Sequence, residues 1–237
     1  MTDVDRIDLD QPRSVGEILA ATLRLYRRYP LLFAILALGV VAPYELGVLA
    51  ITGYGPLTQH ESVGIFYLLL LIRTVLITPL ISALHIHAVV SIGEGRRPRL
   101  DTVALRGVQV LPVVAAAAVM SSLGIVLGYV ALIVPGILLG LRWAVVAQAA
   151  ALEHEGWLGA LRSSGRLTHG HYWHVLGLIL AAGALTVAVG IGARAIPLGS
   201  TSGVGSVTAG IVVETLVASF AALTLAMLYF DLQSRRA

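Results

Sequence analysis

Four ionisable side chains lie inside long apolar stretches of the sequence: Glu45, Arg73, Arg142 and Glu214. A charge at the centre of a bilayer costs about 2.5–3.5 kcal/mol even on insertion scales, so such residues need a partner or a function. Two acids and two arginines at comparable depth form a balanced set. The sequence predicts either structural ion pairs in a helix bundle or a polar site open to one membrane face. As a third alternative, a long side chain such as that of Arg142 extends to the membrane surface and keeps its charge in water.

Depth within the apolar stretches indicates which of these charges meet. Glu45 and Arg73 lie at similar depths in consecutive stretches joined by a short connection, which makes them the first predicted pair. Arg142 with Glu214 is the complementary pair. Arginine keeps its charge in proteins, so it cannot escape burial by neutralisation and holds a nearby carboxylate ionised. We therefore predict that Arg73 bonds to at least one of the two glutamates.

The histidines give a weaker signal for chemistry. His85 and His87 are two residues apart, which on a helix separates them by about 200° and prevents chelation from one face. We expect both to protrude towards water at the end of the second apolar stretch. His171 and His174 are three apart and can share a face, but a histidine at the membrane edge is more often a solvated polar group than a ligand. We predict no metal site and no cofactor.

Nucleophilic catalysis also finds little support. Ser121-Ser122 and Ser163-Ser164 have neither a nucleophile-elbow glycine pattern nor a general base placed by a recognisable motif. The glycine-rich run at residues 199–210 lacks the end of a phosphate-binding loop. The chain has no cysteine, which removes thiolate nucleophiles and thiolate metal sites. The sequence therefore predicts no catalytic residue.

The elements that carry these residues follow from composition. Hydrophobic residues make up 57% of the 237 residues and charged residues only 12%, whereas a soluble domain has about 25% charged residues. The predicted fold class is therefore an all-α polytopic membrane protein. Six stretches are near or above the roughly 20 residues that cross about 30 Å of hydrocarbon. They are residues 31–52, 63–90, 108–134, 136–152, 172–193 and 206–230.

Prolines and glycines predict where these helices bend and touch. Val134-Pro135-Gly136 is expected to break one long apolar run into a tight hairpin, because proline disfavours helix in the residue before it. Thr78-Pro79 predicts a kink or tilt in the second span. Small residues four apart let helix backbones approach closely. Such pairs, Gly124 with Gly128 and Gly136 with Gly140, mark a contact between spans three and four or between two copies, or else are scattered glycines.

The arginines predict the orientation. Thirteen of the sixteen lie on one side of the six-span map, and the opposite connections are almost free of them. The positive-inside rule places that side, with both termini, in the cytoplasm. The abundance of Arg, Ala, Val and Gly without lysine is typical of a GC-rich bacterial genome, so we expect the bacterial cytoplasmic (inner) membrane. Residues 1–13 are then a cytoplasmic tail and residues 14–237 a single membrane domain.

Two segments on that side have the pattern of amphipathic interfacial helices. Ser14 and Glu17 have capping-box spacing, and a helix from there would carry Arg24, Arg27 and Arg28 on one face and apolar residues on the other. The segment before span five repeats this design, with Trp157 on one face and Arg162 and Arg166 on the other. A weaker copy covers residues 101–107. Further charge pairing is expected to dock them: Glu153 with Arg162 or Arg166, and Asp231 with the helix of Arg24.

Three stretches have a family-like pattern: SVGEILAATLRLYRRYP, LYFDLQSRR and, as the most specific, PGILLGLRWAVVAQAAALEHEGWLGALRSSGRLTHGHYWHVLGL. The motif residues are Pro135-Gly136, Arg142, Glu153, Ala160-Leu161, Ser164, Leu167, Gly170 and Trp173. The chain resembles the bacterial glycerophosphoryl diester phosphodiesterase membrane domain family over nearly its whole length. Gly165, where the family tends to have an aromatic, and His169 and His171, where it tends to have basic residues, depart from the pattern. The resemblance implies a six-helix membrane fold. It implies no reaction, because the phosphodiesterase chemistry belongs to a separate soluble domain that we do not expect in this chain.

Three functions remain open from the sequence. The first is a non-catalytic membrane protein that binds or organises lipid or a partner protein, with Arg24, Arg27, Arg28, Trp157, Arg162, Arg166 and Trp173 facing the lipid headgroups. Its partners would be the bilayer, anionic headgroups and a second copy or another membrane protein, with no nucleic acid. The second is a small transporter that uses the intramembrane charges, and would need a cavity that reaches Glu45 and Arg73. The third is a membrane-embedded lipid enzyme, and would need a nucleophile in contact with a base.

Overall fold

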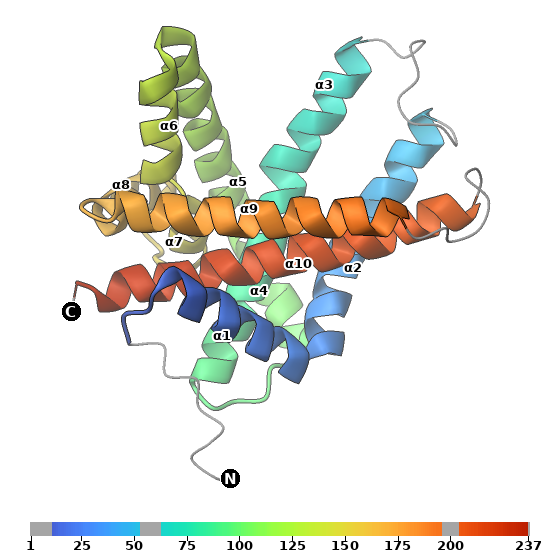
Figure 1. The fold of residues 1–237 in the computed structure, drawn as a ribbon, viewed down its shortest axis with the longest axis horizontal. Coiled ribbons are helices and arrows are strands. Elements are labelled where there is room, and N and C mark those ends of the chain that lie inside the picture. The colour runs from blue at the N-terminus through green and yellow to red at the C-terminus, as the bar shows by residue number, and fades with distance from the viewer. Residues whose placement is uncertain (1–10, 53–62, 196–203, 237) are drawn as a thin grey trace.

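A computed structural model describes residues 11–52, 63–195 and 204–236, and within these ranges every regular element is a helix (Figure 1). This confirms the all-α fold class. The elements are α1 Val15–Arg28, α2 Pro30–Thr52, α3 Val63–Ile72, the π-helical turn η2 Arg73–Ile77, α4 Thr78–Gly93, α5 Leu100–Ala131, α6 Ile133–Arg142, α7 Val146–Leu152, α8 Gly156–Thr168, α9 Tyr172–Ala195 and α10 Val204–Ser234.

Six helical segments are long and apolar enough to cross a membrane, in the order expected from the sequence. The second consists of α3, η2 and α4, and the fourth of α6 and α7 with a turn at residues 143–145 between them. Large apolar side chains remain exposed along the segments, such as Leu71 and Val130, as is required of surfaces that face lipid. The protein is therefore a multi-pass membrane protein.

Helix α4 lies at the centre of the bundle. It packs against α2, α5, α7 and α10, and its side chains from residue 81 to residue 89 are all buried. The expectation that His85 and His87 protrude towards water is therefore wrong, since they are 0% and 8% exposed. The sequence pattern misplaced them because α4 continues into a part of the bundle that other helices cover.

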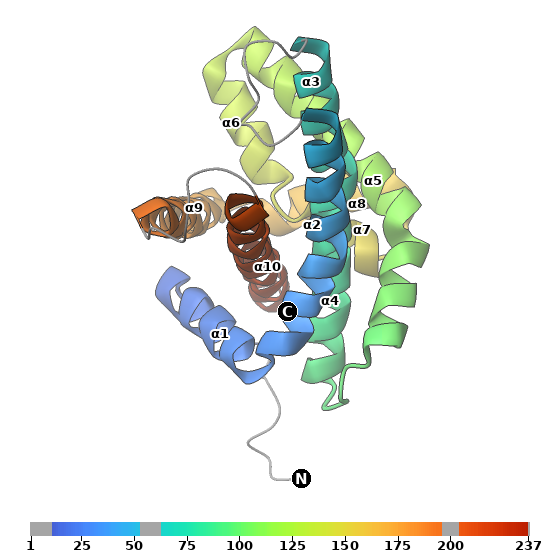
Figure 2. The same ribbon diagram turned by 90° about the vertical axis from the view of Figure 1, so that its right-hand side faces the viewer.

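Helices α9 and α10 run side by side and cross the other spans steeply. They extend across Figure 1, whereas Figure 2 shows α10 nearly end-on beside the upright α2 and α4. In Figure 2 the turn from α4 to α5 lies at the lower end of the bundle, on the side of α1, and the turn from α5 to α6 lies at the upper end. The second, third and fourth spans therefore alternate in direction.

The hairpin between α5 and α6 turns at Leu132, whose extended backbone (φ −164°, ψ 152°) separates the two helices. The predicted break at residues 134–136 is wrong by a few residues, because Pro135 lies in the first turn of α6, where a missing N–H is tolerated. A Cβ on Gly128 would lie 3.0 Å from the Cα of Gly136. The two backbones thus approach as closely as the glycine spacing predicted. Gly140 has open space instead.

The segment at residues 101–107 is the first part of α5 and not a separate interfacial helix. That prediction is wrong because nothing interrupts the helix before the apolar run. Val103 and Gly107 are buried, and a Cβ on Gly107 would meet the Leu84 side chain. This packing against α4 makes the first turns of α5 part of the bundle.

Candidate functional site

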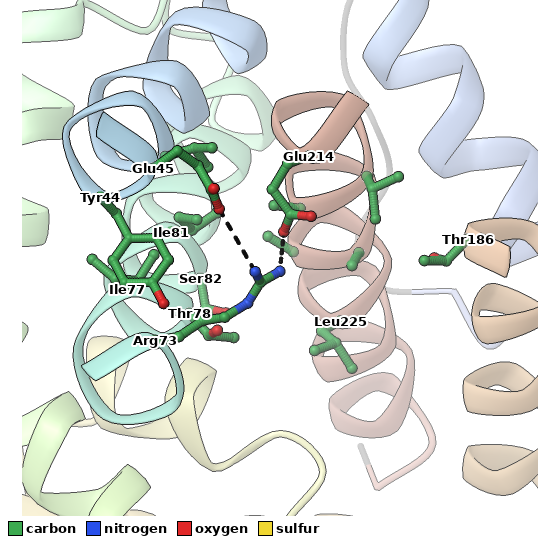
Figure 3. Close-up of a pocket in the computed structure, with 15 residues that line it drawn as sticks. Tyr44, Glu45, Arg73, Ile77, Thr78, Ile81, Ser82, Thr186, Glu214 and Leu225 are labelled. Carbon is green, nitrogen blue, oxygen red and sulfur yellow. Dashed lines mark hydrogen bonds and ion pairs between the residues drawn. The ribbon is translucent and has the colours of Figure 1, made fainter. Parts of the chain in front are cut away.

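Three of the four predicted intramembrane charges come together at the junction of α2, η2 and α10. Arg73 begins η2, Glu45 lies in α2, and Glu214 lies in α10. The Arg73 guanidinium donates a hydrogen bond from Nη2 to Glu214 Oε1 and places Nη1 3.8 Å from Glu45 Oε1 (Figure 3). We call these three residues the charge cluster.

A local change of helix type positions Arg73. The π-helical turn over residues 73–77 immediately precedes Thr78-Pro79, and the Thr78 N–H bonds to the Arg73 carbonyl. Proline has no N–H to donate to the carbonyl four residues earlier. The helix accommodates this missing hydrogen bond with one wider, π-helical turn. The disturbance predicted at Pro79 therefore takes the form of a π-helical turn that begins at the charged residue.

A cavity of about 220 Å³ adjoins the charge cluster. Apolar side chains of α2, α4 and α10 form much of its wall, and the remaining polar contributions come from Tyr44, Thr78, Ser82 and Thr186. The side chain of Arg73 is 41% exposed and those of Glu45 and Glu214 are 28% and 30% exposed. The cluster is thus accessible from the cavity. Two carboxylates against one guanidinium give it a formal charge of −1, which suits a bound cation or amine.

Arg142 does not join the charge cluster, so the predicted Arg142–Glu214 pair is wrong. Arg142 is the last residue of α6, and its side chain lies over Gly165 of α8, where a Cβ would come within 2.8 Å of the guanidinium Nε. Its carbonyl accepts hydrogen bonds from Ser164 Oγ and Thr168 Oγ1, both at 3.0 Å. The short α6 ends against α8, and these hydroxyls satisfy a carbonyl that a helix end leaves without an intrahelical donor.

Glu153 fastens α8 to the bundle, but through hydroxyl groups. Its Oε1 accepts hydrogen bonds from Ser163 Oγ at 2.7 Å and from Tyr229 OH at 2.8 Å. The predicted partners, Arg162 and Arg166, are exposed, so that prediction is wrong. Ser163 faces the core because it lies on the buried side of α8, and the arginines occupy the opposite side.

Asp231 fastens the segment that precedes α1. Its fully buried carboxylate (0% exposed) accepts hydrogen bonds from the Arg13 backbone N–H at 2.5 Å, His174 Nε2 at 3.0 Å and Arg235 Nε at 2.9 Å. The sequence predicted that Asp231 docks the helix of Arg24. Docking takes place instead through the backbone of Arg13, whose carbonyl also accepts from Arg235 Nη2 at 2.5 Å.

The histidines near this point do not assemble a metal site. Within the described ranges, no group of three or more His, Cys, Asp or Glu side chains is placed to hold a metal ion. His174 is hydrogen-bonded to the Asp231 carboxylate through its Nε2. Partial burial, followed by the charge of Arg235, lowers the pKa of His171 below its ordinary value.

Helices α1 and α8 each bury one side and expose arginines on the other. The capping box at the start of α1 is confirmed, because Glu17 N–H donates to Ser14 Oγ and the Glu17 carboxylate accepts from Ser14 N–H. The Ser14 backbone hydrogen bond is the main reason that the pKa of Glu17 is lowered. Residues 18, 21, 22 and 25 of α1 are buried. The side chains that the sequence predicted to face headgroups are all exposed: Arg24, Arg27, Arg28, Arg162, Arg166, Trp157 at 38% and Trp173 at 86%.

Sequence reasoning missed a hydroxyl–imidazole contact in the core. His85 Nε2 lies 2.8 Å from Ser219 Oγ, the Nδ1–H donates to the Ile81 carbonyl at 2.8 Å, and the ring stacks on Phe33. A serine beside a histidine is the arrangement of an activated nucleophile. Both side chains are 0% exposed, so no substrate reaches this pair. The two residues are 134 positions apart, and no local pattern marks them.

Together, these features define a multi-pass helical membrane protein with a charge cluster on a cavity and with two helices, α1 and α8, that contact α10 and expose arginines. Comparisons of the chain with known protein families, with curated proteins and with solved structures find no match.

Proposed function

We propose that this protein is a non-catalytic component of a bacterial cytoplasmic membrane that binds anionic lipid headgroups through α1 and α8. The observation that carries the proposal is a set of exposed arginines that form no ion pair within the described residues, next to exposed tryptophans. They are Arg24, Arg27, Arg162 and Arg166, with Trp157 and Trp173. Arginine beside tryptophan at the edge of apolar helices is typical of the headgroup region.

The way in which the two helices are held supports this proposal. Asp231 of α10 accepts a hydrogen bond from the segment that begins α1. Glu153 connects α8 to α10, because it accepts hydrogen bonds from Ser163 of α8 and from Tyr229 of α10. These contacts are made by the buried sides of the helices. The arginines on the other sides are therefore held ready for an external anion, either a lipid headgroup or the acidic surface of a partner protein.

The proposal includes membership of the glycerophosphoryl diester phosphodiesterase membrane domain family. Several residues that carry the resemblance belong to one contact region, because Arg142 lies over α8 and Ser164 donates to its carbonyl. Gly165, which departs from the family pattern, is the position that the Arg142 side chain covers. An aromatic ring at this position would displace the Arg142 side chain, so the glycine is what allows Arg142 to lie against α8.

The first test reverses two charges on α8. Replacing Arg162 and Arg166 by Glu should reduce selective retention of phosphatidylglycerol over phosphatidylcholine in mixed micelles by roughly tenfold or more, because each arginine near an anionic surface contributes about 1 kcal/mol. Retained lipid is measured by mass spectrometry of the purified protein. The matched control reverses Arg97 and Arg99, which precede α5. Equal losses in both variants would show that α8 has no particular role.

The proposed orientation has its own test. A reporter that works only in the cytosol should be active when fused after Ala237 and inactive when inserted near Thr58, because the arginine-rich side of the protein faces the cytoplasm. Reporter activity in intact bacteria is the measurement. The reverse pattern would place α1 and α8 on the outer face and would remove the bacterial inner leaflet as their partner.

A transporter is the second candidate, and the cavity of about 220 Å³ that reaches Glu45 and Arg73 favours it. The formal charge of −1 on the charge cluster would suit a cation or an amine. Proteoliposomes loaded with a pH-sensitive dye should then show a cation-dependent proton flux that Glu45→Gln removes, while a Glu94→Gln variant keeps it. A flux equal to that of empty liposomes would exclude proton-coupled transport.

A lipid enzyme is the third candidate and has the least support. Its serine would have to meet both a base and a substrate. Ser219 meets His85 but is fully buried, and Ser163, which donates to Glu153, is 5% exposed. Their burial supports the non-catalytic proposal.

A further inference from the structure

A second cavity, of about 330 Å³, lies between α4, α5 and the end of α7, away from the charge cluster. These three helices pack against one another and are visible together on the right of Figure 2. The wall contains His87, Arg106, Gln109 and His154, and its apolar part is Val90, Val110, Ala151 and Leu152. All the titratable side chains among these lining residues are basic.

His87 provides an independent sign that the cavity takes a ligand. Its side chain is 8% exposed, and its Nε2 is buried without a hydrogen-bond partner in the described structure. A buried polar atom normally has a partner, since an unsatisfied one costs about 1–3 kcal/mol. A ligand in the cavity would satisfy Nε2 and meet the side chains of Arg106 and His154, which line the same cavity.

The other basic groups line the entrance. Arg106 and His154 are exposed, and Arg106 makes no ion pair with any residue that the structure describes. Gln109 lies three residues beyond Arg106 on α5, so both side chains face the same direction. The cavity therefore has one buried ring nitrogen without a partner, that of His87, and an arginine, a histidine and an amide at exposed positions of its wall.

Nearby acids do not neutralise these groups. Glu153 is engaged by Ser163 and Tyr229. The side chain of Glu155 lies against Gly159 of α8, where a Cβ would collide with it. Both flank His154 in sequence, but neither carboxylate lines the cavity. The cavity is therefore partly apolar and carries the positive charge of Arg106.

We propose that this cavity binds a phosphate group, either the headgroup phosphate of a lipid or a free phosphate. A guanidinium pairs with phosphate through two parallel hydrogen bonds, and the histidine and glutamine groups supply further donors. Arg106 lies in the second turn of α5, near the turn that carries Arg96, Arg97 and Arg99. This position is at the edge of the membrane-crossing part, where headgroup phosphates are found. The site is separate from the headgroup-facing sides of α1 and α8.

The experiment uses the full-length protein in detergent and isothermal titration with dioctanoyl phosphatidic acid, inorganic phosphate and dioctanoylglycerol, which has the same acyl chains but no phosphate. We expect Arg106→Gln to weaken phosphatidic acid binding by about 10- to 100-fold, because a charge-assisted hydrogen bond is lost. Arg97→Gln removes an equal charge from an exposed position outside the cavity and should leave the affinity unchanged. Gln109→Leu, also at an exposed position, should weaken binding without loss of folding.

Two further outcomes distinguish the source of the phosphate. Competition by inorganic phosphate at millimolar concentration would identify the phosphate group as sufficient. Binding of phosphatidic acid without such competition would identify a lipid-borne phosphate, with the acyl chains along Val90 and Val110. Equal affinities for Arg106→Gln, Arg97→Gln and the unmodified protein would overturn the proposal, as would binding of dioctanoylglycerol as tight as that of phosphatidic acid.

Discussion

Replacing Arg73 by Gln should lower the free energy of unfolding by about 3 kcal/mol, the low end of the range for breaking a buried ion pair. The variant leaves Glu45 and Glu214 facing one another across the cavity without the cation that both contact. Two carboxylates in a low-dielectric environment repel each other and cannot be solvated as in water. We use the low end because the Arg73 side chain is 41% exposed to the cavity and its surroundings.

A double-mutant cycle separates pairing from packing at this site. Glu214 accepts the hydrogen bond from Arg73, whereas Glu45 contributes an ion pair at 3.8 Å. The Arg73→Gln/Glu214→Gln double variant should therefore be more stable than Arg73→Gln alone, and the coupling should exceed that between Arg73 and Glu45. The measurement is unfolding by a denaturing detergent in mixed micelles, with helicity as the readout.

The control for this cycle is the pair between Arg96 and Glu94, which is exposed at the turn between α4 and α5. Its removal should change stability little, because exposed ion pairs gain little over their hydrated separate charges. Strictly additive effects of Arg73→Gln and Glu214→Gln would mean that the charge cluster contributes no pairing energy. The transporter hypothesis would then also lose the coupled charge cluster on which it depends.

Replacing Asp231 by Ala should destabilise the protein by about 3 kcal/mol or more and release α1 from the bundle. The carboxylate is fully buried and accepts from Arg13, His174 and Arg235. Without it, a backbone N–H and two basic side chains lose their acceptor at once, and breaking a buried charged network typically costs about 3–5 kcal/mol. Asp231→Asn keeps an acceptor oxygen and should have a smaller effect.

Two measurements check this prediction. Detergent-induced unfolding gives the stability, and limited trypsin digestion reports on α1, because Arg24 and Arg27 become cleavable when that helix undocks. Asp101→Ala is the matched control, since Asp101 is exposed and its side chain bonds to its sequence neighbours Arg99 and Thr102. Slow cleavage of α1 in Asp231→Ala, equal to that of the control, would show that the network does not hold the helix.

The sequence alone determined the class of protein and the parts that depend on local order along the chain. Six apolar segments follow from hydropathy, which is a sum over consecutive residues, and the structure has them. The start of α1 follows from the Ser14–Glu17 spacing, because a capping box uses only residues within one helical turn. The presence of charges such as Arg73 in apolar segments was also readable, since their cost depends on depth.

Only the tertiary structure decided which partners these residues have. Arg73 and Glu214 are 141 positions apart, and His85 and Ser219 are 134 apart. Depth in a span was equally compatible with Arg142 as the partner of Glu214, and α6 ended too early against α8 for that pairing. Hydropathy also gave no reason to bury His87, which depends on α5 and α7 covering α4. Side-chain partners in a helix bundle depend on how each helix is rotated, where it ends and what it packs against, and these properties arise only when segments distant in sequence meet.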